Sequence, residues 1–107
     1  MGDIERNCLR AFATSAAGYA LPLSARSTRC RPWASSLFVG HRLTIAVGSD
    51  DDARLDAWLI ALPEAELTWP GHFVASTEVV ERSANAATIE VLIVEDYNTL
   101  RKYVRSP

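Results

Sequence analysis

The sequence predicts an α+β domain in which a ferredoxin-like βαββα arrangement builds an antiparallel sheet with its helices on one face. Three observations predict this class. Residues 43–47, LTIAV, are rich in β-branched side chains and precede a glycine, which is typical of a strand. Residues 50–62 carry apolar side chains at helical spacing, and two further extended segments follow at 66–82 and 88–94.

Size and composition fit one domain. The chain has 107 residues, of which 49% are hydrophobic and 22% are charged, close to the average of soluble globular proteins. A chain of this length buries roughly 60 to 70% of its unfolded surface, so it needs no metal or disulfide for stability. We divide it into an N-terminal helix and irregular arm at 1–36, packed on a sheet domain at 37–107.

The N-terminal segment is predicted to hold one helix over residues 3–17, capped by Asp3. Its apolar face consists of Ile4, Cys8, Ala11 and Phe12. Residues 18–36 lose this periodicity, and Pro22, Pro32 and several serines and threonines predict an irregular segment or short extended pieces there.

The stretch GSDDDARLD at 48–56 concentrates aspartates, which raises the question of a metal site. Ser49 and Asp52 have the spacing of a capping box, and Asp50 and Asp51 then fall in the first helical turn, where the helix dipole favours anions. The apolar stripe of this helix is Leu55, Trp58, Leu59 and Leu62. The segment also lacks the ligand spacing of a calcium-binding EF-hand. We therefore interpret the aspartates as a helix start without a metal ion.

Pro63 ends this helix, and residues 66–69 are predicted to form a strand. Pro70 and Gly71 then break or bulge the strand, because proline lacks the N–H that a sheet ladder uses. The extended pattern resumes over residues 72–82.

A turn at 83–87 leads to residues 88–94, TIEVLIV, whose nearly continuous apolar character predicts a central strand covered on both faces. Asp96 can cap a last helix. The apolar stripe of that helix is Tyr97, Leu100 and Val104.

Residues 61–71, ALPEAELTWPG, take the place of a helix end and second strand, and in this the chain resembles the small ligand-binding modules of the Lrp/AsnC type. The resemblance is one of architecture and carries no residue role with it. We expect the strand that completes the sheet to come from the N-terminal third or from a second subunit. An unpaired sheet edge favours association, so we expect a homodimer.

Charge is distributed unevenly along the chain, although its net value is only −2. Residues 1–47 contain six arginines against Asp3 and Glu5, whereas residues 48–96 contain eleven acids against two arginines. Segments of opposite charge attract each other within one fold or between two subunits.

Nucleic acid is not an expected partner. Three arginines and a tryptophan of the arm combine cations with a stacking ring, as single-strand binders do. They are Arg26, Arg29, Arg31 and Trp33. Against this, the pI is near 5.6 and the acidic middle of the chain repels phosphates. We expect the arm to dock on the acidic surface of its own fold or of its dimer mate.

Four side chains are of the types that bind soft metals, namely Cys8, Cys30, His41 and His72. Structural zinc sites take ligands in pairs a few residues apart, a spacing that is absent from this sequence. We expect no metal, no other cofactor and two reduced thiols, which is typical of a cytoplasmic protein. Apolar runs of about five residues are far short of the ~20 that a membrane span needs. The arginine and alanine content indicates a GC-rich, bacterial coding sequence.

The candidate ligand site is the stretch TWPGH at 68–72 with the residue that follows it. Trp69, His72 and Phe73 place two aromatic rings and an imidazole around a break in a strand, and such breaks often border binding clefts. The alternative is that both aromatic residues are core anchors.

These observations predict a small non-catalytic module that binds a small-molecule ligand or another protein. The alternative is a small dimeric ferredoxin-like enzyme that acts on a small organic substrate, with His72 as its acid or base. The sequence contains no phosphate-binding loop, nucleophile elbow or zinc-protease motif, so no catalytic residue is assigned under the leading hypothesis.

Overall fold

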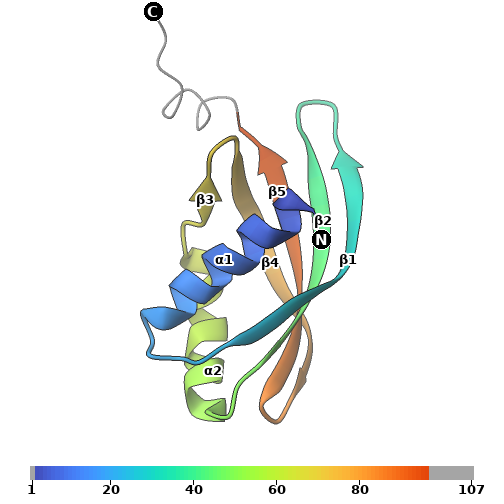
Figure 1. Ribbon diagram of the computed structural model, residues 1–107. Helices are drawn as coiled ribbons and strands as arrows, with labels where there is room; N and C mark the ends of the chain where they lie inside the picture. Colours follow the sequence, from blue (N-terminus) through green and yellow to red (C-terminus); the bar gives the residue numbers. More distant parts are fainter. Residues whose placement is uncertain (1, 97–107) are drawn as a thin grey trace, which may run out of the picture.

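The computed structural model describes residues 2–96, and both of its main helices lie on the same side of one sheet (Figure 1). In chain order the elements are α1 (Asp3–Ala17), β1 (Ser24–Ala34), β2 (Val39–Gly48), α2 (Asp52–Ala61), the 3-10 helix η1 (Leu62–Glu64), β3 (Thr68–Trp69), β4 (His72–Ser83) and β5 (Ala86–Glu95). The predicted α+β class with an antiparallel sheet is confirmed.

The five strands form one antiparallel sheet in the order β1-β2-β5-β4-β3. This order differs from the predicted ferredoxin-like one, because β1 comes from the N-terminal third and pairs with β2 along its length. The prediction that residues 18–36 are irregular is therefore wrong for Ser24–Ala34. These residues form an edge strand of mainly exposed polar side chains, so they lack the apolar alternation that marks a half-buried strand.

Helix α1 forms over the predicted residues because its apolar side chains repeat at helical spacing. Its buried side chains are Cys8, Phe12 and Ala16. Gly2, rather than the predicted Asp3, is the N-cap, and the Glu5 carboxylate accepts a hydrogen bond from the Gly2 N–H at 3.2 Å. Asp3 instead lies in the first turn, where the partial positive charge of the helix end favours an acid.

Helix α2 presents its predicted apolar stripe to the core. The buried residues of α2 and η1 are Leu55, Trp58, Leu59 and Leu62. The Trp58 ring meets the Phe12 ring edge to face, with centroids 5.6 Å apart, and Trp58 Nε1 donates to Ser15 Oγ at 3.0 Å. A buried indole needs such a partner for its N–H, so these contacts join α1 and α2 across the core.

The segment around Pro70 and Gly71 is a hairpin turn, so of the two predicted alternatives the strand is broken here and not bulged. Trp69 and His72 pair directly across it. Gly71 has a φ of 86°, in the left-handed region that glycine adopts without strain, and a preceding proline is favoured at the first central position of such a turn. The chain therefore reverses here, and β3 is only two residues long.

Strand β5 is central, as predicted, but the helices of residues 2–96 cover only one of its faces. Ala87, Ile89, Val91 and Ile93 are buried, whereas Thr88, Glu90 and Leu92 between them are half-buried. The first set belongs to the core cluster that includes the helices, and we call this side of the sheet the covered face. We call the other side the open face (Figure 1).

Two further predictions concern helices. The predicted last helix, with Tyr97, Leu100 and Val104 on its apolar side, lies outside the described residues. Within residues 2–96, no helix has the length and apolar character needed to cross a membrane.

Candidate functional site

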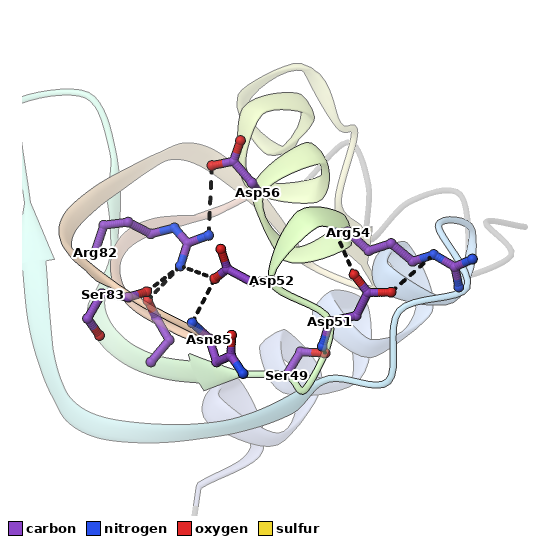
Figure 2. Close-up of polar contacts among 9 residues, drawn as sticks. Ser49, Asp51, Asp52, Arg54, Asp56, Arg82, Ser83 and Asn85 are labelled. Atoms are coloured by element: carbon purple, nitrogen blue, oxygen red, sulfur yellow. Dashed lines mark hydrogen bonds and ion pairs between the residues drawn. The ribbon is translucent and has the colours of Figure 1, made fainter.

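The acidic cluster at the start of α2 is held by contacts within the protein (Figure 2). Asp51 is the N-cap, and its carboxylate accepts from the Arg54 N–H at 3.0 Å. The Ser49 hydroxyl accepts from the Asp51 N–H at 3.2 Å. The predicted capping box between Ser49 and Asp52 is therefore wrong in its cap residue, although the aspartates do begin a helix.

Asp52 ties α2 to the turn between β4 and β5 (Figure 2). Its Oδ1 accepts from the Asn85 N–H at 2.7 Å and lies 3.0 Å from Arg82 Nη1. The hydrogen bond from Asn85, followed by that from Arg82, lowers the pKa of the Asp52 carboxyl. Arg82 also approaches Asp56, with Nη2 and Oδ1 3.8 Å apart. Asp51, Asp52 and Asp56 thus all have structural partners.

The cysteines and histidines are not gathered into a cluster. Within residues 2–96, no three His, Cys, Asp or Glu side chains are grouped so as to hold a metal ion. Burial raises the pKa of the Cys8 thiol to about 12. Cys30 is exposed on β1, and its pKa is raised by partial desolvation and then by the negative charge of Glu5. Both pKa values are raised, so neither cysteine is an activated nucleophile.

The three predicted ligand-binding residues do not meet in one site. Trp69 and His72 face each other across the β3–β4 hairpin, and their rings stack with centroids 6.1 Å apart and planes at 24°. Phe73, the next residue along the strand, is paired with Val94 of β5 and lies on the opposite face of the sheet. Trp69 and His72 therefore lie on one face of the sheet and Phe73 lies on the other.

A groove of about 510 Å³ opens between α1 and the segment that carries Trp69. Its lining includes Asn7, Arg10 and Thr14 from α1 and residues 65–70, but neither His72 nor Phe73. Trp69 is 8% exposed, and its Nε1 has no hydrogen-bond partner among the described residues. The groove is large enough for a small ligand and has one unpaired donor beside it.

The open face carries charge in two halves. On β1 and β2 it presents Arg26, Arg29, Arg31 and Arg42, and on β4 and β5 it presents Glu78, Glu81 and Glu90. The register of the sheet aligns these residues in rows across the strands. One row is Arg29, Thr44, Glu90 and Glu78, and a neighbouring row is Arg26, Ala46, Thr88 and Glu81. The face is therefore basic along one side and acidic along the other.

Two pairs of like charges stand side by side on the open face. Arg31 is opposite Arg42 in the β1–β2 ladder, and Glu78 is opposite Glu90 in the β4–β5 ladder. Like charges at such positions destabilise a sheet. Within the described part of the chain, the ion pairs involve other residues, so none of the open-face arginines and glutamates is neutralised by a salt bridge.

One end of the open face is apolar. A row of Trp33, Gly40, Val94 and Phe73 crosses the sheet here. A Cβ atom on Gly40 would lie 1.9 Å from the carbonyl oxygen of Ile93, so glycine is required at this position. Beyond the row, Leu37 and Phe38 of the turn between β1 and β2 are exposed, as is Val39 at the start of β2. Exposed apolar side chains gathered at one place are typical of a protein-binding surface.

The sequence identified half of this surface. It marked three arginines and Trp33 of the arm as a group, and the bulge between Ser27 and Arg29 keeps all four on the open face. It missed the fourth arginine, Arg42, and the glutamates. Their common position follows from the strand pairing and from the bulges of β4 at Ala75 and Val80, neither of which a local sequence pattern reveals.

Comparisons of this chain with protein-family models, with curated protein sequences and with solved structures find no match. An inference of function therefore rests on the chemistry of the molecule itself. Its two candidate surfaces are the open face and the groove beside Trp69.

Proposed function

We propose that the protein is a non-catalytic protein-interaction module that acts as a homodimer. The observation that carries this proposal is the open face, a surface of four strands that no helix of residues 2–96 covers and that separates positive from negative charge. Such a surface is complementary to itself, because the basic half of one copy attracts the acidic half of another.

A nucleic acid is a poorer partner for the same face. Glu78, Glu81 and Glu90 lie in the same sheet as the arginines. A phosphate backbone laid across four strands would meet these carboxylates, and the repulsion would offset the few arginine contacts. The mixture of signs therefore favours a protein partner.

A second candidate function is the binding of a small molecule in the groove beside Trp69. The observation in its favour is the buried Trp69 Nε1, since an unpaired buried donor costs about 1–3 kcal/mol that a ligand acceptor would recover. The enzyme alternative is less favoured, because the His72 ring stacks on Trp69 and does not line the groove. A thermal-shift screen of small carboxylic acids tests the groove, and stabilisation by a true ligand must weaken in Trp69→Phe.

We also propose a ferredoxin-like relationship for the fold and a cytoplasmic location. The elements β2, α2, β4 and β5 follow a βαββ order, with β5 between the two strands that α2 connects, and β1 takes the position of a further strand beside β2. The free thiols of Cys8 and Cys30 support a reducing compartment.

Sedimentation equilibrium of the full chain, from about 1 to 200 μM, tests the homodimer over the range of ordinary protein–protein affinities. We expect the mean mass to rise from 11.7 kDa toward twice that value as the concentration increases. A mass that stays at 11.7 kDa at every concentration would contradict the proposal.

A further inference from the structure

We propose that two copies of this chain pack open face to open face about a two-fold axis that runs parallel to the strands, between β2 and β5. This inference rests on the proposed homodimer and adds the surface and the symmetry of its interface. A two-fold interface brings one patch onto itself, so the residues of that patch must be complementary to one another.

The charge pattern selects the direction of the axis. An axis parallel to the strands exchanges the two sides of the sheet, so that β1 lies over the partner's β4 and β2 lies over the partner's β5. The basic side of each copy then faces the acidic side of the other. An axis that ran across the strands would leave each side over itself and would place arginines on arginines, an arrangement that like-charge repulsion disfavours.

With the parallel axis, each row of the sheet meets itself in reverse order. Arg29 comes over Glu78 of the partner subunit, and Arg26 comes over Glu81 of the partner subunit. Packed sheets lie about 10 Å apart, a gap that arginine and glutamate side chains reach across from the two sides. Symmetry repeats each of these contacts.

The pair of glutamates on β4 and β5 is stabilised in this arrangement. Glu78 and Glu90 are neighbours in the ladder and repel each other in the isolated chain. In the dimer the two carboxylates together bind the guanidinium of Arg29 of the partner subunit. The repulsion that destabilises the monomer is therefore relieved on association, which favours the dimer further.

The apolar end supplies burial that surface ion pairs alone do not provide. In the row that contains Gly40, reversal places Trp33 over Phe73 of the partner subunit. Both rings are half-buried in the single chain, so each has area left to lose to a partner. Aromatic residues that an interface buries are often among those that contribute most to its binding energy.

The edges of the sheet are less suitable for association than its open face. Strand β1 has a bulge after Ser27 and contains Pro32, which has no N–H to offer. The free edge of β4 is interrupted by two bulges, at Ala75 and Val80. Bulges and prolines are the usual means by which edge strands avoid pairing with other chains.

The open face also has a suitable size. Four strands about 4.8 Å apart and about nine residues long span roughly 20 by 30 Å. The side chains that project from this area present more surface than its flat outline. The total approaches the roughly 800 Å² per partner of a standard interface.

Complementary charge reversal tests the arrangement. One variant, Arg26→Glu/Arg29→Glu, places acids at both ends of the two charged rows, and a second, Glu78→Arg/Glu81→Arg, places arginines at both ends of the same rows. We expect each variant alone to have a dimer dissociation constant raised about 100-fold or more. An equimolar mixture of the two is expected to form a heterodimer, because every contact is then between opposite charges.

The control for the first variant is Arg6→Glu/Arg10→Glu, which makes the same change in net charge as Arg26→Glu/Arg29→Glu but on exposed positions of α1, on the helix side. It is expected to dimerise like the wild type. Circular dichroism shows whether each variant is folded, and formation of the heterodimer shows it independently, since both partners must be folded to associate.

The outcomes separate the inference from the proposed function on which it rests. Variants that dimerise as well as the wild type, or single variants that are monomeric and stay so when mixed, would overturn the face-to-face arrangement while the homodimer stands. A wild-type chain that is monomeric at all concentrations would overturn the proposed function itself. Monomeric single variants that restore each other in the mixture would support both.

Discussion

The two faces of the sheet are made by the same strands and have opposite chemistry. On the covered face, Ile45 lies opposite Ile89, and both are fully buried. One residue back along β2, Thr44 lies opposite Glu90 on the open face, where both are half-buried. A single step along the strand therefore changes a packed apolar pair into a polar pair that solvent reaches.

The difference shows how the position of a surface charge is determined. Because side chains alternate with a period of two, a shift of one residue in strand register would move every buried side chain to solvent. The covered face prevents such a shift, since its apolar residues must meet the helices. The rows of arginine and glutamate on the open face therefore owe their order to packing on the other side.

The largest effect is expected from the covered face. Trp58→Ala removes a fully buried side chain together with its ring contact to Phe12 and its hydrogen bond to Ser15. The free energy of unfolding should fall by about 3–5 kcal/mol, measured by urea denaturation. Trp33→Ala is the matched variant, because Trp33 is half-buried on the open face. It should lower the free energy of unfolding of the monomeric chain much less. Equal losses of unfolding free energy from the two substitutions would contradict the difference in packing between the two faces.

A smaller loss is expected at the row that crosses the apolar end of the open face. Gly40→Ala places a Cβ atom 1.9 Å from a carbonyl oxygen of β5, so the backbone must move. We expect a loss of about 1–3 kcal/mol in denaturation experiments. Gly48→Ala is the control, because its Cβ would lie 3.3 Å from the nearest atom and needs only a slight adjustment. If both substitutions are tolerated equally, the close approach at Gly40 does not constrain the sheet.

A substitution on the open face should stabilise the monomer. Glu78→Gln removes the like-charge pair with Glu90 and should raise the free energy of unfolding by about 0.2–1 kcal/mol, measured at a concentration low enough to avoid dimers. Glu81→Gln is the control, because Glu81 lies opposite the uncharged Thr88. Destabilisation by Glu78→Gln relative to Glu81→Gln would show that the two carboxylates do not repel each other.

The smallest effect concerns the junction of α2 with the β4–β5 turn and depends on pH. The pKa of Asp52 is lowered in the folded protein, so its contribution is complete above the ordinary aspartate pKa of about 3.9 and is lost as the pH falls through the lowered value. Asp52→Asn should therefore destabilise the protein at pH 7, and the difference from the wild type should shrink in acid. Asp50→Asn is the control, because it removes a carboxylate from the same segment and leaves the contacts of Asp52 with Asn85 and Arg82 in place.

The sequence predicted the parts of the fold whose side chains face the core. The spacing of Cys8 and Phe12 located α1, that of Leu55 and Trp58 located α2, and the apolar run at 88–94 located the central strand. Strand β1 was missed because it lies at an edge, so that packing requires little of its side chains and leaves no periodic apolar signal. A local apolar pattern locates the segments that pack in the core, whereas an edge strand is determined mainly by its hydrogen bonds to the neighbouring strand.

The candidate sites were less predictable for a related reason. Trp69 and His72 are close because Pro70 and Gly71 form a turn, a relation that their spacing allows but does not require. The separation of Phe73 from them follows from strand alternation once β4 is known to begin at His72. The open face could not be predicted from local patterns, because its glutamates and arginines come from strands that meet only through long-range pairing.

The central position of β5 also has a consequence during protein synthesis. In chain order β5 is the last of the five strands, yet it forms the ladders that join the β1–β2 pair to β4. As a chain leaves the ribosome from its N-terminus, the earlier strands must wait with their apolar sides unmatched until Ala86–Glu95 emerges. Folding of this domain is therefore completed by a late, non-local step, and the nascent chain is most exposed to misassociation just before it.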